Sequence, residues 1–198
     1  MRRTEMMIEK AFVELLHERD FQAITVQDIA ERAMVNRATF YDHFADKYVL
    51  FERTILTMMR QSFESRLPAD LSYSPESMPL LIATVCEFVA QVDERCRHGA
   101  VQGLPPFDEK VVEMVSELLH KWLRDSQIEQ PADSRKLVAN VASWAIYGAA
   151  SQWRAQPHRE SITAYVAQVV PLITSLIEQG VLTPLRPEFR KPIRPERA

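Results

Sequence analysis

The chain has 198 residues, of which 46% are hydrophobic and only four are glycine, and its formal net charge is −3 at pH 7. A net negative chain lacks the broad basic surface with which proteins coat nucleic acid regardless of sequence, so any nucleic-acid contact must be local. Cys86 and Cys96 are the only cysteines, and they form neither a CxxC pair nor a disulfide framework, so we expect no metal and no cofactor.

The start of the chain resembles neither a signal peptide nor a membrane anchor. Met1-Arg2-Arg3 is followed by an amphipathic pattern instead of an apolar core segment, and nowhere do about 18 apolar residues follow one another. We therefore expect a soluble, cytoplasmic protein without a membrane partner.

Helical periodicity dominates the chain, and no strictly alternating apolar run stands out, so the predicted fold is all-α. The first helix is expected from about Thr4 to Arg19. It has one apolar stripe, formed by Met7, Ile8, Ala11, Phe12, Leu15 and Leu16. This stripe is expected to pack against the two short helices that follow.

The next helix is expected to start at Thr25, because Asp28 stands three residues later and completes the pattern of a capping box. After Met34 and Val35, Asn36 is a good N-cap for another short helix, on which Phe40 and Phe44 share one face. Two short helices joined by a tight turn predict a helix-turn-helix, which presents the other face of its second helix to a DNA duplex.

Longer helices are expected in the rest of the chain. Asp46 caps one that runs to about Arg66, and Pro- and Ser-rich residues up to Pro75 form a connector. Further helices are expected at about 75–97, 107–126, 133–155 and 161–179. We expect Pro171 to kink the last of these helices, Gly180 to end it, and the Pro- and Arg-rich tail after Thr183 to be disordered.

The helix-turn-helix resembles the signature of the TetR family of transcriptional regulators, which is roughly I-A-x-x-A-G-V-S-x-x-T-x-Y-x-H-F-x-x-K. Matching residues are Ile29, Ala30, Ala33, Val35, Thr39, Tyr41, His43, Phe44 and Lys47. Met34 stands where the family usually has glycine, and Asn36 stands where it usually has serine.

This resemblance implies a DNA-binding domain at 1–47, a helical effector-binding and dimerisation domain at 48–183, and a tail at 184–198. The residues expected to contact double-stranded operator DNA are Thr25, Gln27, Asn36, Arg37, Ala38, Thr39, Tyr41, His43 and Lys47. Arg37 is suited to guanine, Thr39 to a thymine methyl or a phosphate, and Tyr41 and His43 to the DNA backbone. The helix starts at Thr25 and at Asp46-Lys47 are expected to face phosphates.

A homodimer on a palindromic site is also implied, most commonly as a repressor. Its interface is expected on the last two helices, through Leu137, Val141, Trp144, 148–151, Tyr165, Val166, Val169, Leu172, Ile173, Leu176 and Ile177. An unidentified, largely apolar small-molecule effector is expected between the helices of the second domain. Candidate pocket residues are Phe88, Met114, Leu118, Trp122, Trp144 and Tyr147.

Two alternatives remain open from the sequence. The first is a TetR-like co-regulator that acts through a protein partner, with the tail as a docking segment. The second is a di-iron helical-bundle enzyme, since Glu14-x-x-His17 and Glu117-x-x-His120 have the spacing that such bundles use. No hydrolase, nucleotide-binding or zinc-protease motif occurs, which favours a regulator over an enzyme.

Overall fold

The computed structural model describes residues 3–95, 107–126 and 132–182, and within these ranges the chain is helical without any strand. The predicted all-α fold is therefore confirmed. In chain order the elements are α1 (Arg3–Glu18), the short 3₁₀ helix η1 (Phe21–Ala23), α2 (Val26–Arg32), α3 (Arg37–His43), α4 (Lys47–Arg66), α5 (Ser77–Arg95), α6 (Phe107–Asp125), α7 (Ala132–Ala155) and α8 (Ile162–Leu182).

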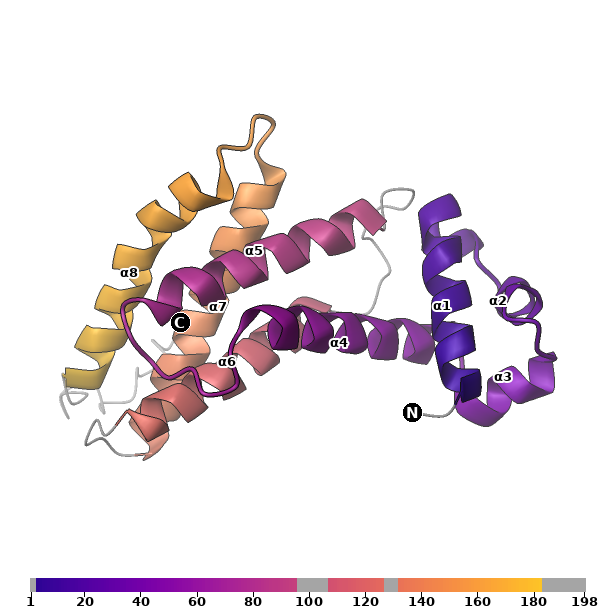
Figure 1. Ribbon diagram of the computed structural model, residues 1–198, viewed down its shortest axis with the longest axis horizontal. Helices are drawn as coiled ribbons and strands as arrows, with labels where there is room; N and C mark the ends of the chain where they lie inside the picture. The colour runs from indigo at the N-terminus through magenta and orange to yellow at the C-terminus, as the bar shows by residue number, and fades with distance from the viewer. Residues whose placement is uncertain (1–2, 96–106, 127–131, 183–198) are drawn as a thin grey trace, which may run out of the picture.

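The helices form two groups joined by α4, as Figure 1 shows. Helices α1, α2 and α3 gather at one end of the elongated molecule, and we call them the head. Helices α5 to α8 form a bundle at the other end, the body, and α4 runs from the head into it.

Aromatic side chains close the core of the head. The ring of Phe12 in α1 meets those of Phe21 and Phe51 edge to face, at centroid distances of 6.2 and 6.4 Å. Such pairs stabilise a core beyond the apolar area that they bury. Phe40 and Phe44 are also buried, as their predicted shared face requires. Along α4 the same core continues into the body through Met59 and Phe63.

Helix α7 packs against α5, α6 and α8 in the body. Its approach to α8 is close at Gly180, where an added Cβ would lie 2.8 Å from a methyl carbon of Val138. Helix α8 continues beyond this glycine to Leu182. The prediction that Gly180 ends the helix is therefore wrong, because Gly180 makes room for Val138 instead.

Helix boundaries elsewhere agree with the predicted ones to within about two residues, while η1 was not predicted. The structure includes Pro171 inside α8, and the kink expected there stays a prediction. Cys96, the connections at 98–106 and 127–131, and the tail 184–198 lie outside the described residues. The division into domains at residue 47 also stays a prediction.

Candidate nucleic-acid interface

The start of α2 is fixed by the capping box expected from the sequence. Thr25 Oγ1 accepts a hydrogen bond of 3.1 Å from the Asp28 backbone N–H, and Asp28 Oδ2 accepts one of 2.8 Å from the Thr25 backbone N–H. These hydrogen bonds satisfy two amides that a helix start leaves without partners. The Thr25 hydroxyl also donates to Asp28, and this hydrogen bond lowers the pKa of the Asp28 carboxyl most. The hydrogen bond from the Thr25 backbone N–H lowers it further.

The turn after α2 is a Schellman motif, which requires a left-handed residue after the helix. The backbone N–H of Val35 donates to the carbonyl of Ala30 at 2.9 Å, and that of Met34 donates to Glu31 at 3.1 Å. Met34 takes the left-handed position with φ of 56°. A methionine thus adopts the backbone conformation that glycine adopts most easily, and its side chain is 85% exposed.

Asn36 caps α3 through a 2.7 Å hydrogen bond from the Thr39 backbone N–H to its Oδ1. The capping role predicted for Asn36 is therefore confirmed. Arg37 and Ala38 are exposed on the first turn, Thr39 is half-buried, and Tyr41 is 49% exposed. A helix-turn-helix reads base edges with this first turn, so α3 has the geometry of a reading helix.

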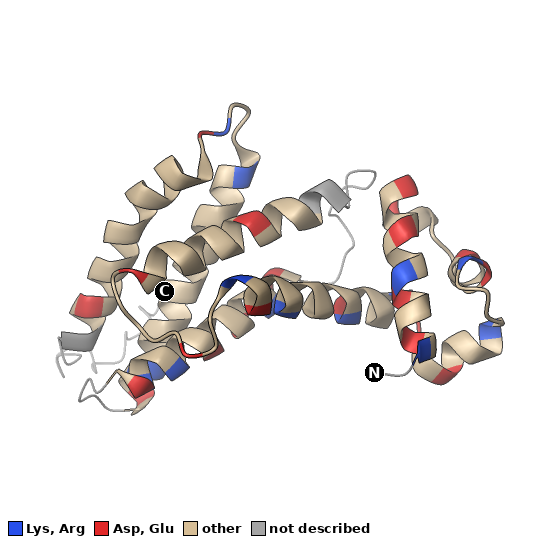
Figure 2. Cartoon of the chain, in the orientation of Figure 1, with Lys and Arg blue, Asp and Glu red and all other residues tan. Residues whose placement is uncertain are grey.

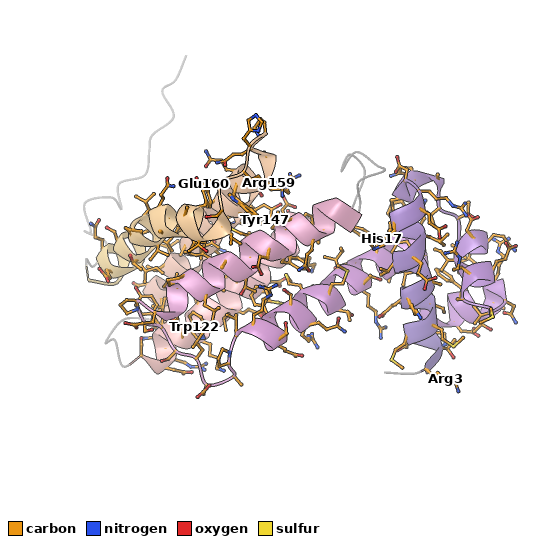
Figure 3. All side chains as sticks on the ribbon, turned by 45° about the horizontal axis from the view of Figure 1, so that its top comes forward. Arg3, His17, Trp122, Tyr147, Arg159 and Glu160 are labelled. Carbon is orange, nitrogen blue, oxygen red and sulfur yellow. The ribbon has the colours of Figure 1, made fainter. Side chains whose placement is uncertain are left out.

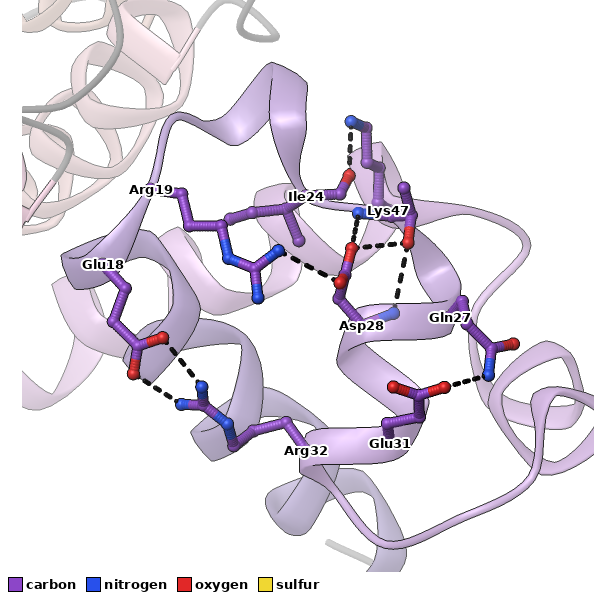
Figure 4. A network of polar contacts seen from close by, with 9 residues as sticks. Glu18, Arg19, Ile24, Gln27, Asp28, Glu31, Arg32 and Lys47 are labelled. Atoms are coloured by element: carbon purple, nitrogen blue, oxygen red, sulfur yellow. Dashed lines mark hydrogen bonds and ion pairs between the residues drawn. The ribbon is translucent and has the colours of Figure 1, made fainter.

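Lys47 is directed inward, contrary to the expected phosphate contact. Its Nζ donates to three backbone carbonyls, those of Phe21, Gln22 and Ile24, at 3.0, 3.1 and 2.7 Å. An ammonium group has three donors, so all of them are used. Burial lowers the pKa of Lys47. We therefore assign Lys47 to holding the start of α4 against η1 (Figure 4), in place of the predicted phosphate contact.

The helix start at α4 is likewise occupied by the chain itself. Asp46 Oδ1 accepts hydrogen bonds of 2.8 Å from the backbone N–H groups of both Tyr48 and Val49. A carboxylate already sits where a phosphate was expected to bind. The same holds at α2, where Asp28 bonds the Thr25 amide.

Two other predicted contact residues have partners within the head. The His43 side chain is only 12% exposed, and its Nδ1 lies 3.5 Å from Glu5 Oε1. Gln27 is exposed and donates to Glu31 one turn further along α2. His43 therefore faces α1, while Gln27 stays on the surface.

Ion pairs lock α2 onto α1 (Figure 4). The Arg32 guanidinium binds both carboxylate oxygens of Glu18, at 2.8 and 2.7 Å, and Arg19 binds Asp28 at 3.1 Å. These arginines are neutralised locally. On the ribbon of the head in Figure 2, the positions of acidic residues are as evident as those of basic residues. Among the described residues no hydrogen bond or ion pair involves Arg37, so its donors are available to a ligand.

The predicted effector residues fall into two groups in the body. Phe88 and Trp122 are 0% and 2% exposed and fill the core, whereas Met114, Leu118 and Tyr147 are half-buried. Trp122 and Tyr147 both lie in the body in Figure 3. Trp144 is 46% exposed, so it lies on the outside of the bundle and not between its helices. Burial raises the pKa of Tyr147, whose ring meets Phe107 edge to face.

The residues predicted to form the dimer interface include both buried and exposed side chains. Five on α8 are buried within this chain, which corrects their assignment to an interface: Tyr165, Val166, Val169, Ile173 and Ile177. Leu172 is 70% exposed on the same helix. On α7 the residues Leu137, Val141 and Trp144 are exposed by 44–49%.

The two E-x-x-H motifs are not brought together. One is on α1 in the head, and the other is on α6 in the body (Figure 1). Glu14 is an exposed partner of Arg32 at 3.6 Å. Within 3–95, 107–126 and 132–182 no three His, Cys, Asp or Glu side chains gather as a metal site. This geometry does not support the di-iron alternative.

Sequence reasoning missed two residues, Glu5 and Arg53, which meet His43 and Phe44 at the C-terminal end of α3. Their partners are distant in sequence, and neither belongs to the motif that pointed to the helix-turn-helix. No local pattern predicts such a contact.

Residues 8–54 match the family model described as bacterial regulatory proteins, tetR family. A curated relative, the uncharacterized HTH-type transcriptional regulator YxbF of Bacillus subtilis (strain 168), is 41% identical over 61 residues. The matched segment covers 30% of this chain but only 15% of the length of that relative. The family match covers most of the head and the first part of α4.

Solved structures resemble the chain over most of its length. The dihydroxyacetone kinase operon activator DhaS has a TM-score of 0.60 at 19% identity, covering 89% of this chain and 97% of its own. NalD of Pseudomonas aeruginosa, the secondary repressor of the MexAB-OprM multidrug efflux pump, has a TM-score of 0.57 at 19% identity. That match covers 88% of this chain and 97% of NalD. At these identities the likeness concerns the fold.

Proposed function

We propose that the chain is a transcriptional regulator of the tetR family of bacterial regulatory proteins, not an enzyme, and that it acts as a homodimeric repressor. It binds a palindromic operator in the cytoplasm and leaves it when a small, largely apolar ligand binds the body. The observation that supports this proposal best is the exposed first turn of α3, where Arg37 has no partner among the described residues.

DNA recognition then depends on a small set of side chains. Arg37 offers a planar fork of donors to guanine, and Tyr41 and Asn36 flank it on the exposed surface. Ala38 and Thr39 complete the contact surface. His43 holds the end of the reading helix against α1, and Lys47 holds the start of α4 against η1.

The proposed dimer joins two copies through the outer face of α7 and α8. Leu137, Val141 and Trp144 are spaced four and three residues apart, so they form one stripe on α7. Helix α8 carries hardly any charge along its length (Figure 2), and Leu172 projects from it. Four helices meeting across a two-fold axis would cover both stripes.

By length and composition alone, the segment Ile162–Gly180 of α8 could cross a membrane. Its mean hydropathy is 1.2, and 28% of it is buried inside the protein. Regulators of this family are soluble DNA-binding proteins, so we assign the exposed part of α8 to a second copy of the chain. A two-fold dimer would place its reading helices about 34–36 Å apart, or a multiple of that spacing, to match two half-sites.

The effector would bind beside the half-buried side chains Met114, Leu118 and Tyr147. Their partial exposure is compatible with contact to a ligand, and sites in helical bundles lie between facing helices. A ligand that favours a conformation with displaced heads weakens the binding of DNA. By reciprocity, DNA weakens the binding of the ligand by the same factor. Helix α4 connects ligand binding in the body to DNA binding by the head.

Selection of bound sequences from a random duplex pool, at physiological salt, tests the DNA-binding proposal. We expect a palindrome to be enriched, and we expect Arg37→Ala to weaken binding to it by about tenfold or more. Arg60→Ala, which changes an exposed arginine on α4, is the matched control. No enrichment by folded protein would contradict operator recognition and favour action through a protein partner.

Light scattering of dilute protein tests the dimer. Val141→Glu places a charge in the apolar stripe and is expected to yield monomers, whereas Gln61→Glu, at an exposed position of α4 outside the proposed interface, is expected to leave dimers intact. A wild-type protein that is monomeric at micromolar concentration would refute the dimer.

The direction of regulation needs a separate assay. NalD is a repressor and DhaS is an activator, so relatives in fold act in both directions. A reporter gene placed behind the selected palindrome is expected to be silenced by the protein. Increased expression would overturn repression while leaving operator binding intact.

A further inference from the structure

Helices α1, α3 and α4 meet in a small charged cluster at the C-terminal end of α3. Arg53 of α4 places Nη2 3.0 Å from Glu5 Oε2 and Nε 3.4 Å from Glu9 Oε1, both on α1. The other Glu5 oxygen lies 3.5 Å from Nδ1 of His43, in the last turn of α3. Arg53 thus connects α4 to α1, and Glu5 extends the connection to α3.

The face of the Arg53 guanidinium makes a further contact. Its central carbon lies 5.5 Å from the ring centroid of Phe44, which caps α3 and is 1% exposed. A guanidinium can stack on a ring while its edge donates to carboxylates, which an ammonium cannot do. The arginine therefore fits this position for its shape as well as its charge.

Burial makes the cluster dependent on Arg53. The side chains of Glu5 and Glu9 are only 16% and 10% exposed. Glu9 Oε1 has no hydrogen bond of good geometry, so its contact with Arg53 is an ion pair alone. Burial raises the pKa of Glu9, while the charge of Arg53 opposes that rise. A buried carboxylate that loses its cation is strongly disfavoured.

Helix α3 is only seven residues long, so its two ends cannot be oriented independently. Its first turn faces the DNA in the proposed function, and its last turn adjoins Glu5 and Arg53. A tilt at the last turn would displace the side chains of the first. Contacts with base edges depend on such placement, whereas contacts with phosphates tolerate more variation.

We propose that Arg53 is a positioning residue, which sets the orientation of the reading helix α3 by joining α4 to α1 and to the C-terminal end of α3. The inference rests on the proposed DNA-binding function. It assigns to Arg53 a share of the discrimination between operator and other DNA, although Arg53 touches no base. It also identifies a contact through which a movement of α4 reaches the reading helix.

The test compares two changes at Arg53 with one control on the same helix. Arg53→Lys keeps the positive charge but lacks the forked, flat guanidinium. Arg53→Gln removes the charge as well as the guanidinium. Arg60→Gln removes a positive charge two helical turns away, at an exposed position without a described partner. Dissociation constants are measured for the selected palindrome and for a scrambled duplex of equal length, at one salt concentration.

We expect both Arg53 variants to lower the ratio of operator to scrambled affinity by about tenfold, as the loss of one well-placed base contact does. Arg60→Gln is expected to leave this ratio within about twofold, because loss of one charge weakens both complexes alike. Arg53→Lys that keeps the wild-type ratio would overturn the proposal.

NMR without DNA gives an independent readout. In Arg53→Gln we expect the pKa of Glu9 to rise further and the amide signals of residues 37–43 to shift, with neither change in Arg60→Gln. Failure of the Glu9 pKa to move, or unshifted α3 amides, would overturn the proposal. If the wild-type protein selects no palindrome, the proposed function fails, and these NMR results still decide whether Arg53 orients α3.

Discussion

Replacing Met34 by glycine is expected to stabilise the protein, although it removes an entire side chain. The φ of 56° places Met34 in the left-handed region, where a Cβ approaches the next carbonyl oxygen at a cost of about 1–2 kcal/mol. Because the side chain is 85% exposed, its removal loses little apolar burial. Glycine loses about 0.5–1 kcal/mol more conformational entropy on folding, so the net gain is about 0.5–1 kcal/mol.

Alanine at the same position separates backbone strain from the loss of the side chain. Met34→Ala keeps the Cβ and therefore the strain, so we expect its free energy of unfolding to stay close to that of the wild type. Urea unfolding followed by circular dichroism measures all three proteins, and the melting temperature provides a second measure. A gain of 1 kcal/mol raises the melting temperature of a chain of this size by about 2–4 °C.

The difference between the glycine and alanine variants is the decisive quantity. If the two unfold at the same urea concentration, the strain at Met34 does not exceed the entropy cost of glycine, and the predicted gain in stability is refuted. A glycine variant less stable than the alanine variant would show that unfolded-state entropy outweighs the steric term.

Four further substitutions have predictable effects on stability. Gly180→Ala is expected to destabilise by about 1–3 kcal/mol, because its Cβ would meet Val138 at 2.8 Å. At Gly148 nothing lies within 4 Å of the added Cβ, so Gly148→Ala should raise the free energy of unfolding by up to about 1 kcal/mol. Thermal unfolding measures both glycine variants, and equal changes in stability at the two positions would contradict this reasoning. Asp28→Asn should cost about 1 kcal/mol at neutral pH. The pKa of Asp28 is lower in the folded protein than its ordinary value of 3.8, so the charged carboxylate stabilises the fold at pH values above 3.8. This stabilisation is lost as the pH falls through the pKa of Asp28 in the folded protein. The gap from the wild type, measured by urea unfolding, should therefore narrow below about pH 4, and a constant gap would refute the assignment. Lys47→Met should lower the free energy of unfolding by about 1–3 kcal/mol, because it removes three hydrogen bonds to backbone carbonyls. It should also leave the salt dependence of DNA binding unchanged, whereas a lost phosphate contact would reduce that slope by about one.

Local hydrogen bonding explains which parts of the head were predictable. Thr25 and Asp28 are three residues apart, and Asn36 bonds an amide three residues away, so both caps follow from sequence spacing alone. The left-handed turn at Met34 was harder, because the residue present is not the one that such a turn favours. The two capped helices on either side located that turn, and no residue within it predicted the left-handed backbone.

Contacts between distant residues explain what was not predictable. The ammonium of Lys47 reaches carbonyls 23–26 residues earlier, and Arg53 reaches Glu5 across 48 residues. A lysine at a helix start looks the same in sequence whether it faces phosphate or the protein interior. The fold decides between them, and it directs both Lys47 and His43 toward partners within the protein.

Packing between helices set the remaining differences. Gly180 resembles a C-terminal cap in the sequence, yet the close approach of Val138 from α7 explains its small size. The apolar residues of α8 likewise occur on more than one side of the helix, and only the structure separates Leu172 from the buried set. Periodicity identifies a helix but not which of its two apolar sides faces its own chain.

Helix α4 is a single rod of 20 residues, so it extends about 30 Å from head to body. A pivot of only about 6° at the body would sweep its opposite end through about 3 Å, roughly one hydrogen-bond length. In the proposed function, a ligand would therefore have no need to reshape the bundle in order to act on the head. The length of α4 would convert a small adjustment in the body into a displacement large enough to disturb contacts with bases.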